Sequence, residues 1–193
     1  MKKLLVVSIA FLWISIFGSI LAEAGGPGGE EDWYEGWSVE KRPNNKATYL
    51  THGRVVWGHE FGFYKNPTDC KGDILWLSFS ARDEKVKDFS RKIVTVSLDI
   101  DGEIFKVQLE MFYAGIIGFT QVMHFSNWLA GEQLMNALEK GHYVTVKILE
   151  PKGLEALLDI KEDEFGLKGF ADSRKAAELL CKGTNLAKYS YIK

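Results

Sequence analysis

The sequence contains only two cysteines, Cys70 and Cys181, and none of the common short motifs of enzymes. It has no G-x-S-x-G, H-E-x-x-H or C-x-x-C element, no P-loop and no Rossmann glycine pattern. These absences exclude the hydrolases, metalloproteases, redox proteins and nucleotide-binding enzymes that carry such signatures. We therefore expect a protein that is not an enzyme and that uses no cofactor or metal.

An excess of one charge sign is missing too. The chain has 24 Lys and Arg against 26 Asp and Glu, a formal net charge of -2. Nucleic-acid binding needs a clustered basic face, which this balance does not provide. The 193 residues are 46% hydrophobic and 13% aromatic, which is enough to form the core of one globular domain.

Long apolar runs are missing after the first two dozen residues. Lys2 and Lys3 precede an apolar stretch from Leu4 to Leu21, and residues 22–24, Ala-Glu-Ala, have the small-x-small form that signal peptidase accepts. We predict a signal peptide over residues 1–24, cleaved after Ala24, and a periplasmic or secreted protein without a membrane span. The alternative is an uncleaved anchor, because an apolar run of about 18 residues is near the lower limit for crossing a bilayer.

Residues 25–36 are rich in glycine and acidic side chains, which favours an extended linker. We expect the folded part to begin near Trp37, where the segment Gly36 to Glu40 has the pattern of a first strand. A single β-rich domain then covers residues 37–183. Residues 184–193 have little continuous apolar character, and we expect a C-terminal tail there.

The clearest structural signal runs from Ile93 to Met111. Apolar and polar residues alternate on both sides of the pair Asp101-Gly102. A period of two places the apolar residues on one face of a strand, and Asp-Gly suits a tight turn because glycine accepts a positive φ. The pattern predicts a β-hairpin in an antiparallel sheet that is covered on one face only.

The flanking segments favour further strands and two helices. Residues 74–80 are apolar on both faces, which indicates a central strand covered on both sides, and residues 143–149 and 154–160 are further candidate strands. Helical spacing predicts helices over residues 127–140 and from Asp172 or Ser173 to Cys181. The charged run at 161–164 is typical of a charged tip or strand end at a solvated surface, and only occasionally of a cation site. The fold class is therefore mainly β, with β-sandwich-like antiparallel sheets and two short-to-medium helices near the C-terminal half.

The histidines offer two patterns of possible chemistry. His52, His59 and Glu60 could supply zinc ligands, but the spacing of the two histidines matches no common zinc signature, so surface or turn positions are favoured. His124 and His142 flank the predicted helix at 127–140 and could form an acid-base pair, although no positioned nucleophile is evident and structural roles are favoured. Residues 99–102 resemble the start of a calcium loop, yet the hairpin turn explains them fully.

The two cysteines would pair in an oxidising compartment. A Cys70–Cys181 disulfide would link the loop before residues 74–80 to the end of the last helix and close a loop of more than 100 residues. In the chain-entropy account such a loop is worth on the order of 4 to 5 kcal/mol. The alternative is two unpaired thiols.

The glycine-rich aromatic run from Val55 to Tyr64 is a candidate partner surface, formed by Trp57, His59, Phe61, Phe63 and Tyr64. Glycines in such a run, here Gly53, Gly58 and Gly62, mark bends or a close approach of backbones. We expect the partner to be a protein.

Four features follow one another along the chain. They are a Trp near the mature start, the hairpin segment Ile100-Asp101-Gly102, a helix ending in Ala137-Leu138-Glu139-Lys140-Gly141, and Phe165-Gly166-Leu167-Lys168-Gly169-Phe170 ahead of an Ala-rich helix. In this order they resemble the invasion-associated locus B family of exported bacterial proteins, which implies a small β-sandwich fold and a non-enzymatic envelope or secreted protein linked to host interaction. The chain lacks a Cys shortly after the first Trp, so the family's disulfide scheme is not carried over, and no catalytic residue is transferred.

Three functions from different classes remain open. An exported binding or accessory protein of the bacterial envelope is favoured, because the leader, the two cysteines and the missing enzyme motifs agree with it. An inhibitor or immunity-type protein could block a partner through the run from Val55 to Tyr64. A hydrolase would need an unrecognised site around His124 and His142.

Overall fold

The structure is a computed structural model, and it describes residues 31–41, 46–56, 58–184 and 186. The predicted signal peptide over 1–24, the first part of the predicted linker and nearly all of the predicted tail lie outside the described residues, as does Trp57. The predicted cleavage therefore stays a prediction.

Ten strands form one antiparallel sheet with the order β1-β2-β3-β4-β5-β8-β7-β6-β9-β10. The strands are β1 Glu31–Tyr34, β2 Trp37–Lys41, β3 Ala47–His52, β4 Glu60–Lys65, β5 Asp73–Ala81, β6 Ile93–Ile100, β7 Glu103–Ile117, β8 Thr120–Ser126, β9 Tyr143–Glu150 and β10 Glu162–Gly166. The helices are the 3-10 helix η1 Glu84–Phe89 and the α-helices α1 Glu132–Lys140, α2 Leu154–Leu157 and α3 Phe170–Cys181. The mainly β fold class is confirmed.

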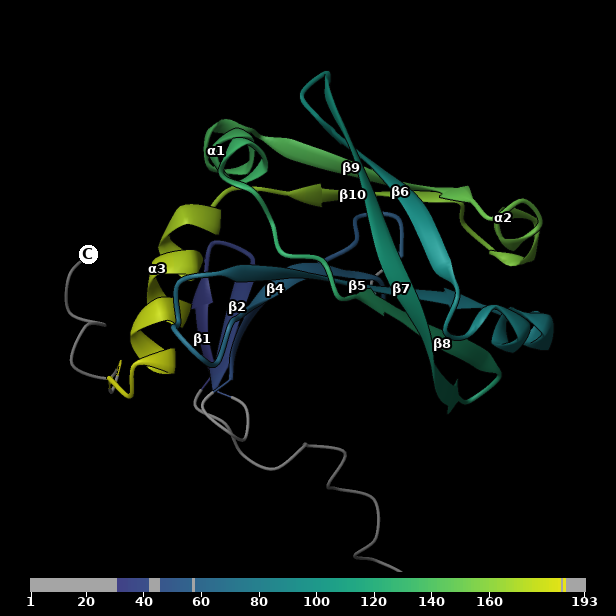
Figure 1. The fold of residues 1–193 in the computed structure, drawn as a ribbon, viewed down its shortest axis with the longest axis horizontal. Helices are drawn as coiled ribbons and strands as arrows, with labels where there is room; N and C mark the ends of the chain where they lie inside the picture. The colour runs from purple at the N-terminus through teal and green to yellow at the C-terminus, as the bar shows by residue number, and fades with distance from the viewer. Residues whose placement is uncertain (1–30, 42–45, 57, 185, 187–193) are drawn as a thin grey trace, which may run out of the picture.

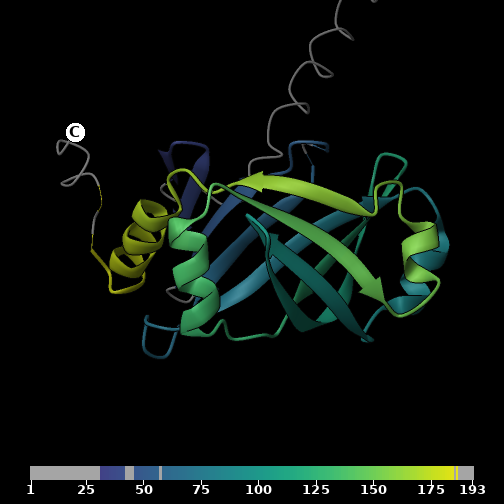
Figure 2. The same ribbon diagram turned by 90° about the horizontal axis from the view of Figure 1, so that it is seen from above.

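The sheet folds over itself into two layers. Figure 1 shows β9 and β10 above β2 to β5, with the long strands β6 and β7 connecting the layers at one side. The free end of the sheet returns to the middle of the other layer, where the backbone N–H of Arg54 donates to the carbonyl oxygen of Glu164 at 2.9 Å. Figure 2 shows α1 and α3 at one end of these layers and α2 at the other.

The predicted hairpin is confirmed. β6 pairs with β7 from Ile93↔Glu110 to Ile100↔Glu103, so the turn consists of Asp101 and Gly102, as the sequence predicted. Both turn residues have positive φ, 48° and 98°, which is the conformation that suits the right-handed twist of the flanking strands.

The ordered sheet starts earlier than predicted. β1 lies within the predicted linker over residues 25–36 and pairs with β2 through a two-residue turn at Glu35-Gly36, where both φ values are positive. The signal was present in the sequence, because a glycine between two aromatic segments is typical of a hairpin turn.

Two other element predictions were wrong. The segment predicted as a strand at 154–160 contains helix α2, and its buried residues Leu154 and Leu158 are four apart, a helical rather than a strand spacing. The helix predicted from residue 127 starts only at Glu132, because residues 128–130 pair with the beginning of β5: Ala130 N donates to Asp73 O at 2.8 Å and Leu75 N to Trp128 O at 3.0 Å.

The core lies between the two layers and is rich in aromatic rings. Trp37 is buried, with its ring centroid 6.1 Å from that of Tyr49, 6.2 Å from that of Phe61 and 5.1 Å from that of Phe170. Its indole N–H donates to the carbonyl oxygen of Gly166 at 3.0 Å. One side chain thus joins β2 to β3, β4, β10 and α3.

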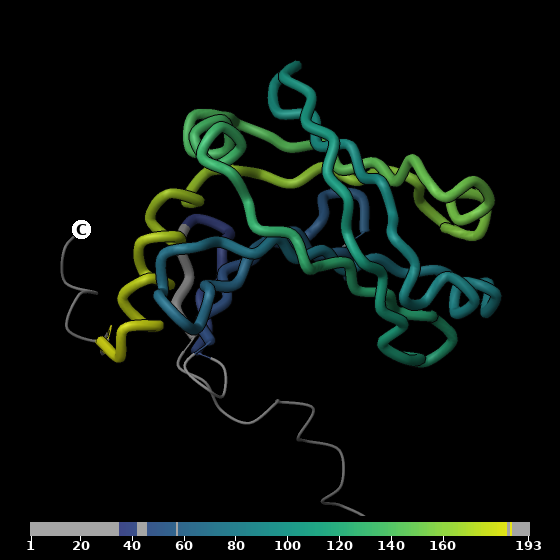
Figure 3. Tube along the Cα trace, viewed as in Figure 1, coloured from purple at the N-terminus to yellow at the C-terminus, as the bar shows by residue number. Residues whose placement is uncertain are grey.

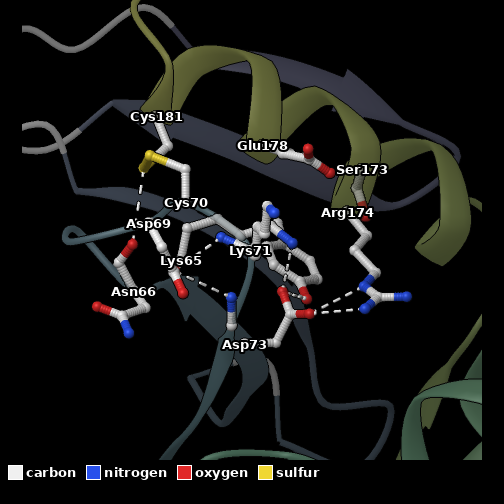
Figure 4. A network of polar contacts seen from close by, with 12 residues as sticks. Lys65, Asn66, Asp69, Cys70, Lys71, Asp73, Ser173, Arg174, Glu178 and Cys181 are labelled. Atoms are coloured by element: carbon white, nitrogen blue, oxygen red, sulfur yellow. Dashed lines mark hydrogen bonds and ion pairs between the residues drawn. A yellow bond between two sulfur atoms is a disulfide. The ribbon is translucent and has the colours of Figure 1, made fainter. Parts of the chain in front are cut away.

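Helix α3 covers β1 to β4 and is attached to the sheet by the predicted disulfide, which is confirmed. Cys70 and Cys181 are separated by 111 positions in the sequence. Figure 4 shows the bridge beside a buried cluster of charges. Asp73 Oδ1 accepts from Tyr49 Oη at 2.7 Å and pairs with Lys65 Nζ at 2.6 Å, while Arg174 of α3 binds Oδ2.

Candidate functional site: an aromatic groove on the outer face of the sheet

A groove of about 770 Å³ lies on the face of the sheet that points away from the core. Along β5, Leu75, Leu77 and Phe79 are fully buried, so the alternating residue Trp76 points outward. The neighbouring strands contribute side chains from positions close to Trp76 across the sheet. The lining residues are Lys46, Thr48, Leu50, Glu60, Phe63, Tyr64, Trp76, Phe112, His124, Ser126 and Asn127.

The floor of the groove is a pair of rings on adjacent strands. The ring centroids of Trp76 and His124 lie 4.3 Å apart, and the indole N–H of Trp76 donates to Glu60 Oε2 at 3.2 Å. Burial lowers the pKa of His124, and the nearby Glu60 carboxylate offsets this only in part. The imidazole is therefore neutral at pH 7, and the floor combines aromatic faces with one carboxylate.

The rim is polar. Lys46 Nζ lies 5.8 Å from the centroid of the Tyr64 ring, and Asn127 donates to Glu110 Oε2 at 2.7 Å. Ser126 Oγ donates to the carbonyl oxygen of Leu75 at 3.0 Å rather than to His124. Hydroxyl and imidazole are thus not arranged as nucleophile and base, and an aromatic floor with a mixed polar rim is the composition of a binding site.

A second hollow of about 1000 Å³ lies at the end of the molecule where β3, β10 and α3 meet. His142 lines it and bonds through Nδ1 to Asp101 Oδ2 at 3.1 Å, whereas His124 lines the groove. The structure therefore does not bring together the two histidines of the predicted acid-base alternative.

A hydrogen-bonded chain of serine, histidine and aspartate joins the edge strand β10 to the middle of the sheet. His59 Nε2 lies 3.1 Å from Ser80 Oγ, and His59 Nδ1 lies 3.0 Å from Asp163 Oδ2. Asp163 also accepts from the backbone N–H groups of Val55 and Val56. His59 and Asp163 are buried, whereas Ser80 is partly exposed. Burial lowers the pKa of His59 more than the Asp163 carboxylate raises it.

Asp163 corrects the prediction of a solvated surface at 161–164, although a strand does lie there. The residue is 1% exposed and belongs to β10. The His59 imidazole and backbone N–H donors take the place of water around its carboxylate, and these partners permit a charged group in the interior.

Three of the five residues predicted as a partner surface are buried, although one of them, Phe63, still lines the groove. His59, Phe61 and Phe63 are 1%, 0% and 1% exposed, and Phe61 and Phe63 lie on the face of β4 that packs on the core. His59 is thus buried, and the favoured surface position was wrong for this residue. Tyr64 points to the other face and lines the groove, and Trp57 lies outside the described residues.

The sequence did not predict that Trp76, Phe112 and His124 line one groove. Strand β5 is central, as predicted, but its outward face is only partly covered. The available signal was an outward Trp in a strand whose opposite face holds Leu and Phe. Register with β8, which the sequence does not encode locally, brings His124 opposite Ser78 and beside Trp76.

The described residues show no ready metal or membrane element. No group of three or more His, Cys, Asp or Glu side chains in this part of the chain is placed to hold a metal ion. No helix within the same ranges is long and apolar enough to cross a membrane. Asp99 Oδ1 accepts from the backbone N–H of Gly102 at 2.8 Å, so this carboxylate serves the hairpin turn.

These features define a disulfide-linked, mainly β protein built from one folded-over antiparallel sheet with a C-terminal covering helix. The sequence profiles of known families give no match, and no curated protein matches in sequence. Among solved structures, the chain is similar to the crystal structure of invasion associated protein B from Bartonella henselae, with a TM-score of 0.50 and 13% sequence identity over 79% of this chain and 99% of that one. At this identity the likeness shows the fold, and the weak resemblance predicted from the sequence is confirmed at that level.

Proposed function

We propose that this chain is an exported, non-enzymatic binding protein that recognises a protein partner through the aromatic groove. The observation that carries the proposal is the groove itself, a hollow of about 770 Å³ that is lined by Trp76, Tyr64 and Phe112 and by the opposite charges of Lys46 and Glu60. Aromatic residues dominate the energetics of protein interfaces, and a hollow of this size accepts an anchoring side chain of the partner. The two opposite charges would orient it.

Export is part of the proposal. The leader pattern, the Cys70–Cys181 disulfide and the likeness to a protein titled as invasion associated support a periplasmic or secreted location and a role toward a host. Mass spectrometry of the protein isolated from its host is expected to find Gly25 as the first residue and no free thiol. A chain that retains Met1, or two thiols that react with an alkylating agent, would contradict it.

The groove is tested by photo-crosslinking. A benzoylphenylalanine placed at Tyr64 is expected to crosslink one partner protein in the native host, and the crosslink should disappear when Trp76→Ala is added. The matched control places the same probe at Tyr143, an exposed tyrosine that lines the second hollow. Equal crosslinking from both positions, or a crosslink that survives Trp76→Ala, would refute the groove as the binding site.

A second candidate function, hydrolysis, rests on the chain of Ser80, His59 and Asp163. The two imidazole nitrogens have the partners that they have in a serine hydrolase, where Nδ1 faces the carboxylate and Nε2 faces the hydroxyl. Reaction with a fluorophosphonate probe separates the candidates. Labelling that Ser80→Ala abolishes would favour the hydrolase, while an unlabelled wild-type protein would leave the three residues with a structural role.

A further inference from the structure

The tip of the β7–β8 hairpin holds three large apolar side chains in solvent. Ile116, Ile117 and Phe119 are 61%, 73% and 96% exposed, and they flank Gly118, which has a φ of 62° at the turn. Soluble proteins seldom gather bulky apolar side chains at one exposed point unless the point binds something.

The tip projects beyond the neighbouring strands. Pairing of β6 with β7 ends at Ile93↔Glu110, and pairing of β5 with β8 ends at Ala81↔Gln121. The last pair, Ile117↔Thr120, therefore lies beyond both neighbouring strands, and at Ile116↔Gln121 only β8 still has a neighbour, Ala81 of β5. Figure 3 shows this loop at the periphery of the molecule.

A protein interface is a poor fit for this feature. A stable interface takes about 800 Å² from each partner. Three side chains of about 200 Å² or less each do not supply that area, and a convex tip does not offer a flat surface. Insertion into a lipid bilayer requires no matching partner surface, because the hydrocarbon adapts to the side chains.

Basic residues lie at the base of the tip. The segment 82–92 contains five Lys or Arg and three Asp or Glu, and its helix η1 contacts β7 and β8. Ser90 Oγ accepts from the backbone N–H of Tyr113, and the Arg91 guanidinium lies 5.0 Å from the centroid of the Phe112 ring. Arg82, Lys87 and Arg91 form surface ion pairs with Asp159, Glu84 and Glu110. Together with the exposed Lys85 and Lys92, they place basic side chains beside the apolar tip, where such side chains can contact anionic lipid headgroups.

We propose that the β7–β8 tip inserts Ile116, Ile117 and Phe119 into the surface of an anionic phospholipid bilayer, with the basic residues of 82–92 on the headgroups. The protein is then a peripheral membrane protein that is oriented by its hairpin. This contact is independent of the groove, so either proposal can fail alone.

The test is sedimentation with vesicles of phosphatidylcholine and phosphatidylglycerol, using protein expressed with its own leader. Wild-type protein is expected to bind, and Phe119→Asp is expected to weaken binding at least tenfold. The matched control is Ile104→Asp, because Ile104 is 62% exposed beside the turn at the other end of β7. Ile104→Asp should bind as the wild type does, and all three should bind less to pure phosphatidylcholine.

Equal binding of Phe119→Asp and wild-type protein would overturn the proposal, as would absence of binding, binding indifferent to the anionic lipid, or a protein captured by the tip in place of vesicles. A second measurement uses an environment-sensitive fluorophore on Phe119→Cys. Its emission should shift to the blue when vesicles are added, and an unchanged spectrum would also overturn insertion. Because Phe119 is 96% exposed, neither substitution removes a core contact.

Discussion

At the scale of single residues, Asp73 has the most to explain, because three side chains bind its carboxylate away from water. Lys65 and Asp73 are each 2% exposed at their side chains, and Arg174 reaches the same carboxylate from helix α3. A buried charge is tolerated only when opposite charges and hydrogen bonds replace the lost water. The cluster therefore couples the position of α3 to β4 and β5.

Asp73→Ala should be strongly destabilising. The substitution leaves Lys65 buried without its carboxylate, and the expected loss in the free energy of unfolding is about 3 to 5 kcal/mol. Urea denaturation measures it. Glu162→Ala is the control, because the Lys147–Glu162 pair is more than half exposed on both sides and should be worth less than about 1 kcal/mol. Similar losses for the two variants would contradict the assignment.

His59 should make stability depend on pH. Burial lowers its pKa in the folded protein, so the unfolded chain, with a pKa of about 6.5, takes up a proton first as the pH falls. The contribution of His59 to the free energy of unfolding should be constant above about pH 6.5. As the pH falls below that value, this contribution should decline by up to about 1.4 kcal/mol per pH unit until the pH reaches the pKa of His59 in the folded protein.

Urea denaturation at pH 7.5 and pH 5.0 checks this. His59→Gln removes the titrating group, so the variant should lose less stability between the two pH values than the wild type does. The comparison of pH effects matters here, because the substitution also alters the buried chain from Ser80 to Asp163. An identical pH effect in both proteins would exclude His59 as the source.

At the scale of elements, strand β4 approaches β3 so closely that one position accepts only glycine. A Cβ at Gly62 would lie 2.3 Å from the carbonyl oxygen of Tyr49 and 2.6 Å from the Cα of Leu50. The sequence pattern predicted close backbone approach in this run, and Gly62 confirms it. Gly58, in the same run, has no atom within 4 Å of the corresponding point.

Gly62→Ala should cost about 1 to 3 kcal/mol of unfolding free energy or more, because the clash is with backbone that cannot move alone. Gly58→Ala should change stability by less than about 0.5 kcal/mol. Thermal and urea denaturation of the pair decide the matter. A Gly62→Ala protein as stable as Gly58→Ala would show that β3 and β4 separate at little cost.

Element boundaries were predicted well only where neighbouring residues decide them. The β6–β7 hairpin depends on alternation and on Asp101-Gly102, and both are local. The beginning of α1 depends on residues 128–130 bonding to β5, more than fifty positions earlier. The sequence pattern therefore remains helical over residues 128–130, although their backbone groups are hydrogen-bonded to the distant strand β5.

At the scale of the whole molecule, the disulfide joins the first half of the sheet to the last helix. Because Cys70 and Cys181 are 111 positions apart, the bridge restricts a large part of the unfolded chain. Replacing both cysteines by serine should lower the unfolding free energy by up to about 4.7 kcal/mol. Wild-type protein treated with a reductant should show the same shift in urea midpoint, and no shift in either sample would contradict a stabilising bridge.

The amino-acid sequence by itself determined the strand-rich class, the central hairpin, the last helix and the pairing of two cysteines, because these depend on periodicity, turn residues and composition. Only the tertiary structure decided which face of each strand is covered. Phe61 and Tyr64 are both aromatic residues of the same glycine-rich run, yet Phe61 packs in the core and Tyr64 lines the groove. Local alternation separates two faces, but distant segments supply the cover, as β10 does when it brings Asp163 to His59.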